Sequence, residues 1–250
     1  MREKPRIALI GFGRMGRTLH DIISERDWPE PQIVDPQDDR MYESIDDLVG
    51  RDVQVCVEFT SPDQAVNNIL ACVRAGMPVV SGTTGWEDER SQVEKAVQDA
   101  EGACIHSNNF SIGVHIFRKT SATLAALLNN YPQYDLAIHE VHHVGKKDTP
   151  SGTALAMAED VLLNNKNKKG IVRGVPEGMI DPTALYVTSE RLGKVFGEHT
   201  VRIDSDSDEI ELIHRAKGRR GFAEGALLAA QWICNKQGMF TLEDMLNDLA

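Results

Sequence analysis

The sequence predicts an α/β protein: a Rossmann-type domain with a parallel sheet, of the kind that binds dinucleotides, and an α+β domain with a mixed sheet. Three observations support this fold class. Over the first hundred residues, short apolar runs alternate with longer amphipathic stretches, as in a parallel sheet that helices cover on both faces. A glycine-rich turn follows the first apolar run. Later in the chain, period-two alternation is common, which is typical of strands that bury one face.

Four strands are predicted in the first part of the chain, where short apolar runs are bounded by glycine or polar residues. They cover 6–10, 53–57, 77–81 and 103–106. The amphipathic stretches between them predict helices over 15–23, 62–75 and 87–101. For the second of these helices, Ser61 is the expected N-cap, Pro62 the first helical residue and Gly76 the left-handed residue past its end. Gly102 is expected to end the third helix.

The second part of the chain combines alternating segments with two helices. Strands are predicted over 135–143, 185–191, 196–203 and 209–216, and helices over 111–130 and 152–165. The stretch 164–178 is rich in Asn, Lys and Gly, so we expect a mobile loop there. From 222 to 250 the pattern returns to helix.

The composition is that of an ordinary globular protein, and it argues against some partners. Of 250 residues, 41% are hydrophobic and 26% are charged. The 38 acidic and 27 basic side chains leave a net charge of −11, which argues against binding to nucleic acid or to an anionic membrane. A local basic pocket remains compatible with that total. No run approaches the roughly 18 apolar residues of a membrane span.

Two further features indicate the compartment. The N-terminal residues are too polar for a signal peptide. The four cysteines are scattered and show no CxxC spacing, so we expect buried, reduced thiols. We therefore expect a cytoplasmic protein.

The glycine-rich turn fits the pattern G-x-G-x-x-G between a predicted strand and a predicted helix. Its members are Gly11, Phe12, Gly13, Arg14, Met15 and Gly16. In a dinucleotide site the first glycine makes the tight turn, the second lets the backbone approach the diphosphate, and the third lets helix and strand pack closely. The helix N-terminus then supplies free N–H groups to the diphosphate.

Asp35 completes the dinucleotide pattern and bears on the choice of cofactor. It ends the next apolar patch, 19 residues after Gly16, where a carboxylate would accept hydrogen bonds from the adenosine ribose. A carboxylate there repels a 2′-phosphate, and Pro36 and Gln37 follow it rather than an arginine. Arg40 is close enough in sequence to compensate. We therefore expect NADH, with use of both NADH and NADPH left open.

The run from His139 to His143 fits H-E-x-x-H, the zinc-peptidase pattern. That pattern works on a helix, where residues four apart share one face. Here the surrounding sequence predicts a strand, on which the two end histidines would lie roughly 13 Å apart at about 3.3 Å per residue. No suitably spaced third ligand follows. We therefore expect no metal.

The segment 140–154 concentrates chemically active side chains. On a strand, Glu140 and His142 share one face and His143 takes the other. Two lysines, Lys146 and Lys147, follow in a loop, and Ser151-Gly152-Thr153 then opens a helix whose free N–H groups form an anion site. A histidine beside a lysine and such a helix start suits a small polyanion that gains a hydride from a cofactor and a proton from the protein. Core histidines and a solvated charged turn are the alternatives.

This segment resembles the signature of the dihydrodipicolinate reductase family, E-x-H-H-x-x-K-x-D-x-P-S-G-T-A, with every fixed position present. The resemblance extends over nearly the whole chain. Its other motifs are Gly13–Gly16, Glu58–Thr60, Gly82–Gly85, Asn109–Val114, Gly197–His199 and Arg219–Ala226.

The resemblance implies an NAD(P)H-dependent enzyme that reduces a small dicarboxylate, leading to tetrahydrodipicolinate on the route to diaminopimelate and lysine. It also implies a homotetramer. A Rossmann domain of 1–108 and 222–250, closed by the C-terminal helices, would bind the cofactor, and 109–221 would bind substrate and form the tetramer. It implies a general acid, His142, and a lysine that binds substrate and assists protonation, Lys146.

Two sets of ligand contacts also follow from the resemblance. The implied substrate contacts are His143, Ser151, Gly152, Thr153 and Arg219. Besides the glycine turn and Asp35, the implied cofactor contacts are Phe59, Thr60, Gly82, Thr83, Thr84, Asn109 and Phe110.

Two departures from the family pattern weaken any expectation of strict NADPH use. The stretch between Asp35 and Ser44 is shorter than in many relatives, and Ser61 stands where some members carry an arginine for the 2′-phosphate.

Three alternative functions are another Rossmann dehydrogenase acting on an amino acid such as aspartate or diaminopimelate, a non-catalytic nucleotide-sensing module, and a zinc hydrolase. The complete signature argues against the first of these. The second would leave His142 and Lys146 without a reason to occur together.

Overall fold

Two sheets organise the chain. The computed structural model describes residues 4–37, 41–175 and 178–249. The expectations made for the first three residues, for Arg40, for 176–177 and for residue 250 lie outside the described residues. The chain divides into two compact units, Met1–Ser111 with Arg219–Ala250, and Ile112–Gly218. Each unit contains one of the sheets.

The first unit contains a six-stranded sheet in the order β11-β5-β4-β3-β1-β2, in which every neighbouring pair is parallel. Its strands are β1 (Ile7–Ile10), β2 (Gln32–Val34), β3 (Val55–Glu58), β4 (Val79–Ser81), β5 (Ala103–His106) and β11 (Gly238–Thr241). β1, β3, β4 and β5 are buried throughout, as expected for a sheet covered on both faces. The predicted Rossmann-type parallel sheet is confirmed.

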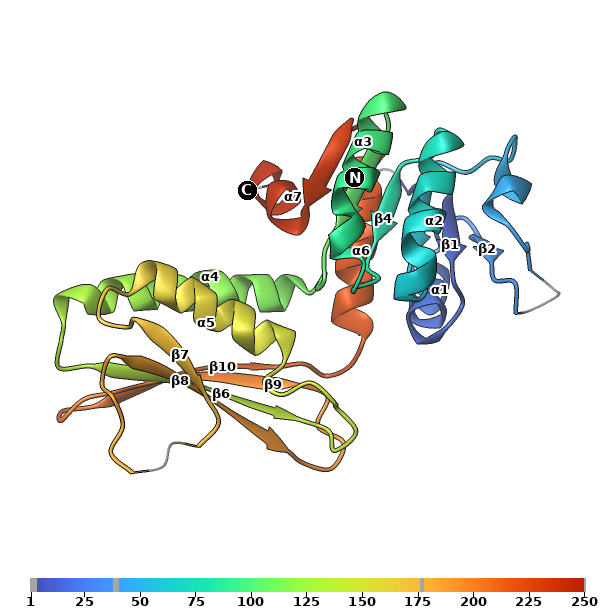
Figure 1. The fold of residues 1–250 in the computed structure, drawn as a ribbon. Helices are drawn as coiled ribbons and strands as arrows, with labels where there is room; N and C mark the ends of the chain where they lie inside the picture. The colour runs from blue at the N-terminus through green and yellow to red at the C-terminus, as the bar shows by residue number, and fades with distance from the viewer. Residues whose placement is uncertain (1–3, 38–40, 176–177, 250) are drawn as a thin grey trace. The chain divides into compact units, whose positions relative to one another are not determined.

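The helices of this unit are α1 (Arg14–Glu25), α2 (Pro62–Arg74), α3 (Arg90–Asp99), α6 (Arg220–Ile233) and α7 (Leu242–Asp248), with 3-10 turns η1 (Ile45–Leu48) and η2 (Glu87–Glu89). α1 packs against α6, and α2 packs against α3 (Figure 1). Ser61 is the N-cap of α2 and Gly76 has φ +73°, as predicted. The third helix is different: it is divided into η2 and α3, and Glu101, not Gly102, takes the left-handed conformation (φ +49°).

The helical segment predicted over 222–250 is interrupted by a strand that the sequence pattern did not indicate. α6 ends at Ile233, and the four-residue strand β11 follows before the short helix α7. Gly238 begins β11, and its N–H donates to the Gly102 carbonyl (2.8 Å). The strand therefore pairs with the edge of β5, whose backbone groups would otherwise lack partners.

The second unit contains a five-stranded mixed sheet in the order β10-β9-β6-β8-β7. Its strands are β6 (Asp135–His142), β7 (Gly170–Arg173), β8 (Ala184–Arg191), β9 (Glu198–Asp204) and β10 (Glu209–Arg215). β6 runs antiparallel to β9 and parallel to β8. The helices α4 (Ile112–Leu127), continued by η3 (Leu128–Asn130), and α5 (Gly152–Asn164) both lie on one face of the sheet (Figure 1). The predicted mixed sheet is confirmed.

The mobile loop expected over 164–178 is wrong for its first half. Asn165 is buried and donates to the Ala125 carbonyl (3.0 Å). The buried Lys168 donates through Nζ to the carbonyls of Pro182 (2.9 Å) and Ala184 (2.8 Å). These polar side chains satisfy buried carbonyls rather than facing solvent, and β7 follows them.

The four cysteines are free. Three of them are buried and Cys234 is partly buried; burial raises the pKa of the Cys104 thiol to about 12. Among the described residues, no helix is long and apolar enough to cross a membrane.

Candidate active site

The glycine turn after β1 has the geometry of a dinucleotide site. Gly11 has φ +91°, a conformation that favours glycine. A Cβ at residue 16 would lie 2.2 Å from the Gly11 carbonyl oxygen, so only glycine lets α1 pack this closely. A Cβ at residue 13 would meet no atom of the described residues within 4 Å. The second glycine therefore faces open space, where a diphosphate could approach the N-terminus of α1 that Arg14 and Met15 begin.

Asp35 lies directly after β2 and contacts the glycine turn. Its Oδ2 accepts a hydrogen bond from the Phe12 N–H (2.9 Å), and its Oδ1 accepts one from the Gln37 N–H (3.0 Å). The carboxylate is thus held beside the turn, as a ribose-binding acid must be. The guanidinium of Arg17 lies 4.7 Å from the centre of the Phe12 ring. The residues present fit the adenosine half of a nicotinamide dinucleotide.

A buried carboxylate, Glu58, joins the ends of the neighbouring strands β3 and β4. Its Oε1 accepts hydrogen bonds from the Thr60 N–H (3.0 Å) and from Thr83 Oγ1 (2.8 Å), and its Oε2 accepts one from Ser81 Oγ (2.7 Å). Thr60 Oγ1 also donates to it. Glu58 therefore fixes Phe59-Thr60 and the Gly82–Thr84 loop relative to each other. The sequence motif contained Glu58, but sequence reasoning gave it no role.

Close packing brings the remaining predicted cofactor segments to the same edge of the sheet. A Cβ at residue 82 would lie 2.0 Å from the Phe59 ring, so Gly82 leaves room for that ring. The Phe59 and Phe110 rings meet edge to face at 6.4 Å. Asn109 Oδ1 accepts from the Ser111 N–H (2.9 Å). The predicted cofactor residues thus gather where parallel strands end, the place where such sheets bind ligands.

In the second unit, the end of β6 carries a buried acid–base cluster around Glu140. Its Oε1 accepts from the Ser151 N–H (3.0 Å), from Ser189 Oγ (2.8 Å) and from Arg191 (3.3 Å). Its Oε2 lies 3.3 Å from Nδ1 of His142. Burial raises the pKa of Glu140, but the neighbouring His142 and the hydrogen bonds from Ser151 and Ser189 outweigh it and hold the pKa well below its usual value.

A second histidine, His199 of β9, lies against His142. The two rings meet edge to face at 5.2 Å, and Nε2 of His199 lies 3.2 Å from Ser151 Oγ. Burial first, and then the neighbouring His142, lower the pKa of His199 to about 4. His199 is therefore neutral at pH 7, which leaves His142 as the member of the pair suited to donate a proton. Sequence reasoning placed His199 in a motif but gave it no role.

The loop and helix after β6 contain the residues of the predicted anion site. Ser151 is the N-cap of α5, and its Oγ accepts from the Ala154 N–H (3.2 Å). A Cβ at Gly152 would meet nothing within 4 Å among the described residues. Lys146, in the loop between β6 and α5, forms an ion pair with Asp148 (2.8 Å).

The two remaining predicted substrate residues are His143 and Arg219. His143 directly follows β6 and is exposed, since successive side chains of a strand point to opposite faces. Arg219 is the N-cap of α6 and belongs to the first unit.

The H-E-x-x-H pattern lies on strand β6 and its end rather than on a helix. His139 points away from His142, with Nδ1 2.8 Å from Thr188 Oγ1. Within the described ranges, a different set, Glu140, His142 and His199, brings one possible metal ligand each to within 4.8 Å. Arg191 already places a positive charge on the same carboxylate, which opposes a bound cation and favours a proton network.

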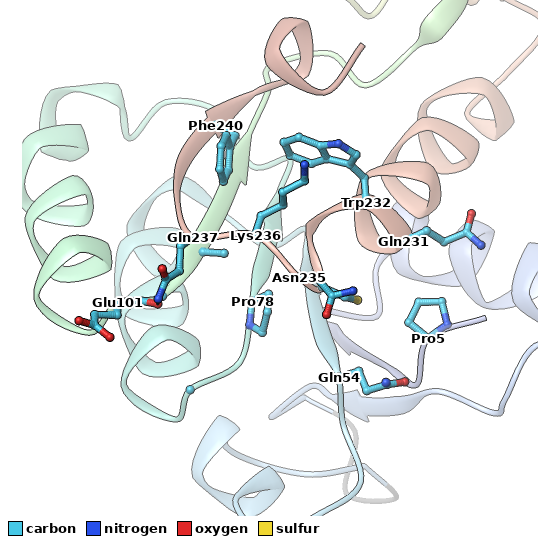
Figure 2. Close-up of a pocket in the computed structure, with 14 residues that line it drawn as sticks. Pro5, Gln54, Pro78, Glu101, Gln231, Trp232, Asn235, Lys236, Gln237 and Phe240 are labelled. Atoms are coloured by element: carbon cyan, nitrogen blue, oxygen red, sulfur yellow. The ribbon is translucent and has the colours of Figure 1, made fainter. Parts of the chain in front are cut away.

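A cavity of about 1060 Å³ lies at the opposite edge of the first sheet, where its strands begin (Figure 2). Pro5, Gln54 and Pro78 line it on one side, and Trp232 and Lys236 on the other (Figure 2). The ammonium of Lys236 is paired with Asp248 (2.8 Å). The cavity contains none of the predicted site residues, and ligands of parallel sheets bind at the other edge.

A parallel sheet with a dinucleotide turn, and a second unit in which Glu140 and His142 are buried beside a helix N-terminus, are features of a Rossmann-type oxidoreductase. Comparison with known proteins gives the family. Residues 5–110 match the family model described as dihydrodipicolinate reductase, N-terminus, and residues 113–246 match its C-terminus. The chain belongs to the dihydrodipicolinate reductase family and is an NAD(P)H-dependent oxidoreductase.

Relatives named 4-hydroxy-tetrahydrodipicolinate reductase match over nearly their whole length. The protein from Christiangramia forsetii is 38% identical over 97% of this chain and 98% of its own. That from Chromobacterium violaceum is 37% identical over 96% and 97%. A dipicolinate-bound dihydrodipicolinate reductase from Paenisporosarcina sp. TG-14 superposes with a TM-score of 0.76 over 96% of this chain and 98% of its own, at 20% identity. That structure has the same fold.

Proposed function

We propose that this chain reduces 4-hydroxy-tetrahydrodipicolinate, by way of dihydrodipicolinate, to tetrahydrodipicolinate in the synthesis of diaminopimelate and lysine. One observation carries the proposal: the complete family signature, Glu140–Ala154, folds so that the buried Glu140 contacts both His142 and the N-cap of α5, Ser151. The first unit binds the cofactor and the second binds the dicarboxylate. The free thiols are consistent with a cytoplasmic enzyme.

The chain's own residues supply binding and a proton. The bound nicotinamide cofactor supplies a hydride to the unsaturated ring of the substrate. His142 donates the proton that completes the reduction, because it lies closer to Glu140 (3.3 Å) than His199 does (3.7 Å) and His199 stays neutral. Lys146 exchanges its partner Asp148 for a substrate carboxylate, and the N-terminus of α5 at Gly152-Thr153 neutralises the other carboxylate. His143, Ser151 and Arg219 are further proposed substrate contacts.

The proposed cofactor is NADH, with use of both cofactors as the alternative. The turn Gly11–Gly16 binds the diphosphate, and Asp35 binds the adenosine ribose. Its carboxylate is held beside the turn by the Phe12 N–H, so a 2′-phosphate would meet a like charge at short range. The edge formed by Phe59-Thr60, the Gly82–Thr84 loop and Asn109-Phe110 accommodates the nicotinamide.

A coupled assay tests the proposed reaction. Pyruvate and aspartate semialdehyde are converted by the preceding synthase, and oxidation of NADH and of NADPH is followed in separate experiments. We expect synthase-dependent oxidation of cofactor, with the higher kcat/KM for NADH. Oxidation that does not exceed the synthase-free control would refute the function, and a clear preference for NADPH would refute the role of Asp35.

Replacement of the proposed catalytic residues tests the mechanism. We expect His142→Asn to lower kcat about 10²- to 10⁴-fold, because it removes a general acid. Lys146→Met should lower kcat and raise the KM for substrate. The dissociation constant for NADH should stay unchanged in both, because neither residue belongs to the cofactor unit. His139→Asn, on the opposite face of the same strand, is the control; wild-type turnover in H142N would remove His142 from its role.

We also propose that the enzyme is a homotetramer that assembles through the second sheet. α4 and α5 cover one face of that sheet (Figure 1). On the other face, Val172 and Ile213 alternate with core residues and are exposed. Light scattering coupled to size-exclusion chromatography should give four times the mass of the chain, and a monomeric mass would contradict this assembly.

A further inference from the structure

We propose that Glu140 is the positioning residue of the proton donor: it orients the His142 imidazole and holds the proton on it until the substrate takes it. The inference rests on the proposed function, in which His142 donates a proton. It adds a buried carboxylate to the reaction, one that touches neither substrate nor cofactor and acts through His142.

The surroundings of Glu140 leave one of its oxygens for the histidine. Ser151, Ser189 and Arg191 all donate to Oε1. Oε2 lies 3.3 Å from Nδ1 of His142, at an angle that does not complete a hydrogen bond. Both atoms are buried and have no other hydrogen-bond partner among the described residues. Nε2 of His199 lies farther from the same oxygen, at 3.7 Å, so Oε2 of Glu140 and Nδ1 of His142 are the closer pair.

The other ring nitrogen of His142, Nε2, has space around it, and a proton donor needs such space for its acceptor. A Cβ at residue 197 would lie only 3.1 Å from Nε2 of His142, so Gly197 leaves the surroundings of this nitrogen uncrowded. With Nδ1–H directed at Glu140, the imidazolium presents Nε2–H as the transferable proton. After transfer, the neutral ring keeps its proton on Nδ1, and the orientation of the ring does not change.

Glu140 also provides the negative charge that lies in contact with the His142 ring. Two positive side chains belong to the neighbouring segments: Arg191 on β8 contacts the Glu140 carboxylate, and Lys146 lies in the loop after β6, where it pairs with Asp148. His199 on β9 is neutral at pH 7, because burial lowers its pKa to about 4. His214 on β10, whose pKa burial also lowers, acts on His199. The Glu140 carboxylate is thus the group in contact with the ring that favours its protonated form.

Glu140 has a second, purely structural contact, so the experiment must separate the two roles. Its Oε1 accepts from the Ser151 N–H and thereby helps to hold the start of α5. Glu140→Gln keeps the size of the side chain and an oxygen for that bond, while it removes the charge. A structural role alone predicts no change in pH dependence for this variant.

The first measurement is the pH profile of kcat in EDTA-treated enzyme. For E140Q we expect kcat to fall about 10- to 100-fold, and its alkaline limb to move to lower pH by about one unit, because the ring loses its proton more readily without the carboxylate. The affinity for NADH should not change. Glu190→Gln is the matched control, because Glu190 lies 3.7 Å from His139 on the other face of the same strand pair, and it should keep the wild-type profile.

A second measurement does not depend on turnover. In protein with labelled histidine, the ring resonances of His142, assigned with H142N, are followed by NMR against pH; the midpoint should fall in E140Q and stay in E190Q. An unchanged midpoint and an unchanged alkaline limb in E140Q would overturn the proposal, as would activity lost to EDTA and restored by a metal. If the wild type shows no turnover, the proposed function is refuted but the role of Glu140 is not. The NMR midpoint of the His142 ring in E140Q then decides whether Glu140 acts on that ring.

Discussion

At the scale of the residue, the glycines of the first turn serve different purposes that substitution can separate. Residue 13 has φ −71°, which alanine adopts readily, and its Cβ would point into open space. We expect Gly13→Ala to fold with a Tm close to wild type and to weaken NADH binding at least tenfold, because its methyl group occupies the space of the diphosphate. Calorimetric titration with NADH and thermal unfolding measure the two effects.

Gly16→Ala is the counterpart of that variant. Its Cβ would lie 2.2 Å from the Gly11 carbonyl oxygen, a backbone atom that cannot rotate away. Overpacking of this kind costs about 1 to 3 kcal/mol, so we expect a lower free energy of unfolding as well as loss of NADH binding. NADH binding by G13A at wild-type affinity would show that the diphosphate does not lie at Gly13.

The residues proposed to act in the reaction could be predicted from the sequence. The residues that hold them in position through hydrogen bonds could not. The contact between Glu140 and His142 follows from the two-residue period of a strand, and it is present. The partners that hold Glu140, Ser189 and Arg191, lie on β8, and no local pattern says that β8 pairs with β6. Glu58 is a similar case, because its partners Ser81 and Thr83 come from the next strand in the sheet.

At the scale of the element, strands were predictable where burial gave them long apolar runs. β1, β3, β4 and β5 are such strands. β7 and β11 have four residues each and lie at sheet edges, where partial exposure leaves little pattern in the sequence. The context decides these segments: β11 forms because the edge of β5 offers backbone partners, and β7 because Asn165 and Lys168 anchor the chain before it.

Helix α6 contains a close contact that predicts a specific change in stability. A Cβ at Gly225 would lie 1.8 Å from the Phe110 carbonyl oxygen. We expect Gly225→Ala to lower the free energy of unfolding by about 1 to 3 kcal/mol, because the helix must move away from the chain at Phe110. Since Phe110 belongs to the proposed nicotinamide edge, the KM for NADH should rise as well. Urea denaturation and steady-state kinetics measure these changes.

Gly221, in the first turn of the same helix, is the matched control. The nearest atom to its added Cβ is Ser111 Oγ, at an ordinary contact distance of 3.7 Å. We expect Gly221→Ala to leave the free energy of unfolding unchanged, or to raise it by up to about 1 kcal/mol, because alanine has a higher helix propensity than glycine. Equal stability of the two variants would show that α6 does not pack on Phe110 as closely as described.

At the scale of the whole molecule, several buried groups make stability depend on pH in the same direction. Burial lowers the pKa of three histidines, His106 in the first unit and His199 and His214 in the second. An unfolded chain binds protons at these residues near their ordinary pKa of 6.5, whereas the folded chain does not. The depressed pKa of Glu140 adds to this only below its ordinary value of 4.5. Acid therefore favours the unfolded state of both units.

The pH range over which stability is lost follows from His199, whose pKa is lowered on folding from 6.5 to about 4. Its contribution is complete above pH 6.5 and is lost as the pH falls, by about 2 kcal/mol between pH 6.5 and 5 at about 1.4 kcal/mol per unit. We expect the Tm to fall steadily over that interval, and His199→Gln to reduce the slope, because glutamine binds no proton in either state. His139→Gln, at a partly exposed position of the neighbouring strand, should keep the wild-type slope. Parallel slopes for H199Q and wild type would contradict the burial of a neutral His199, and with it the charge balance that leaves His142 as the proton donor.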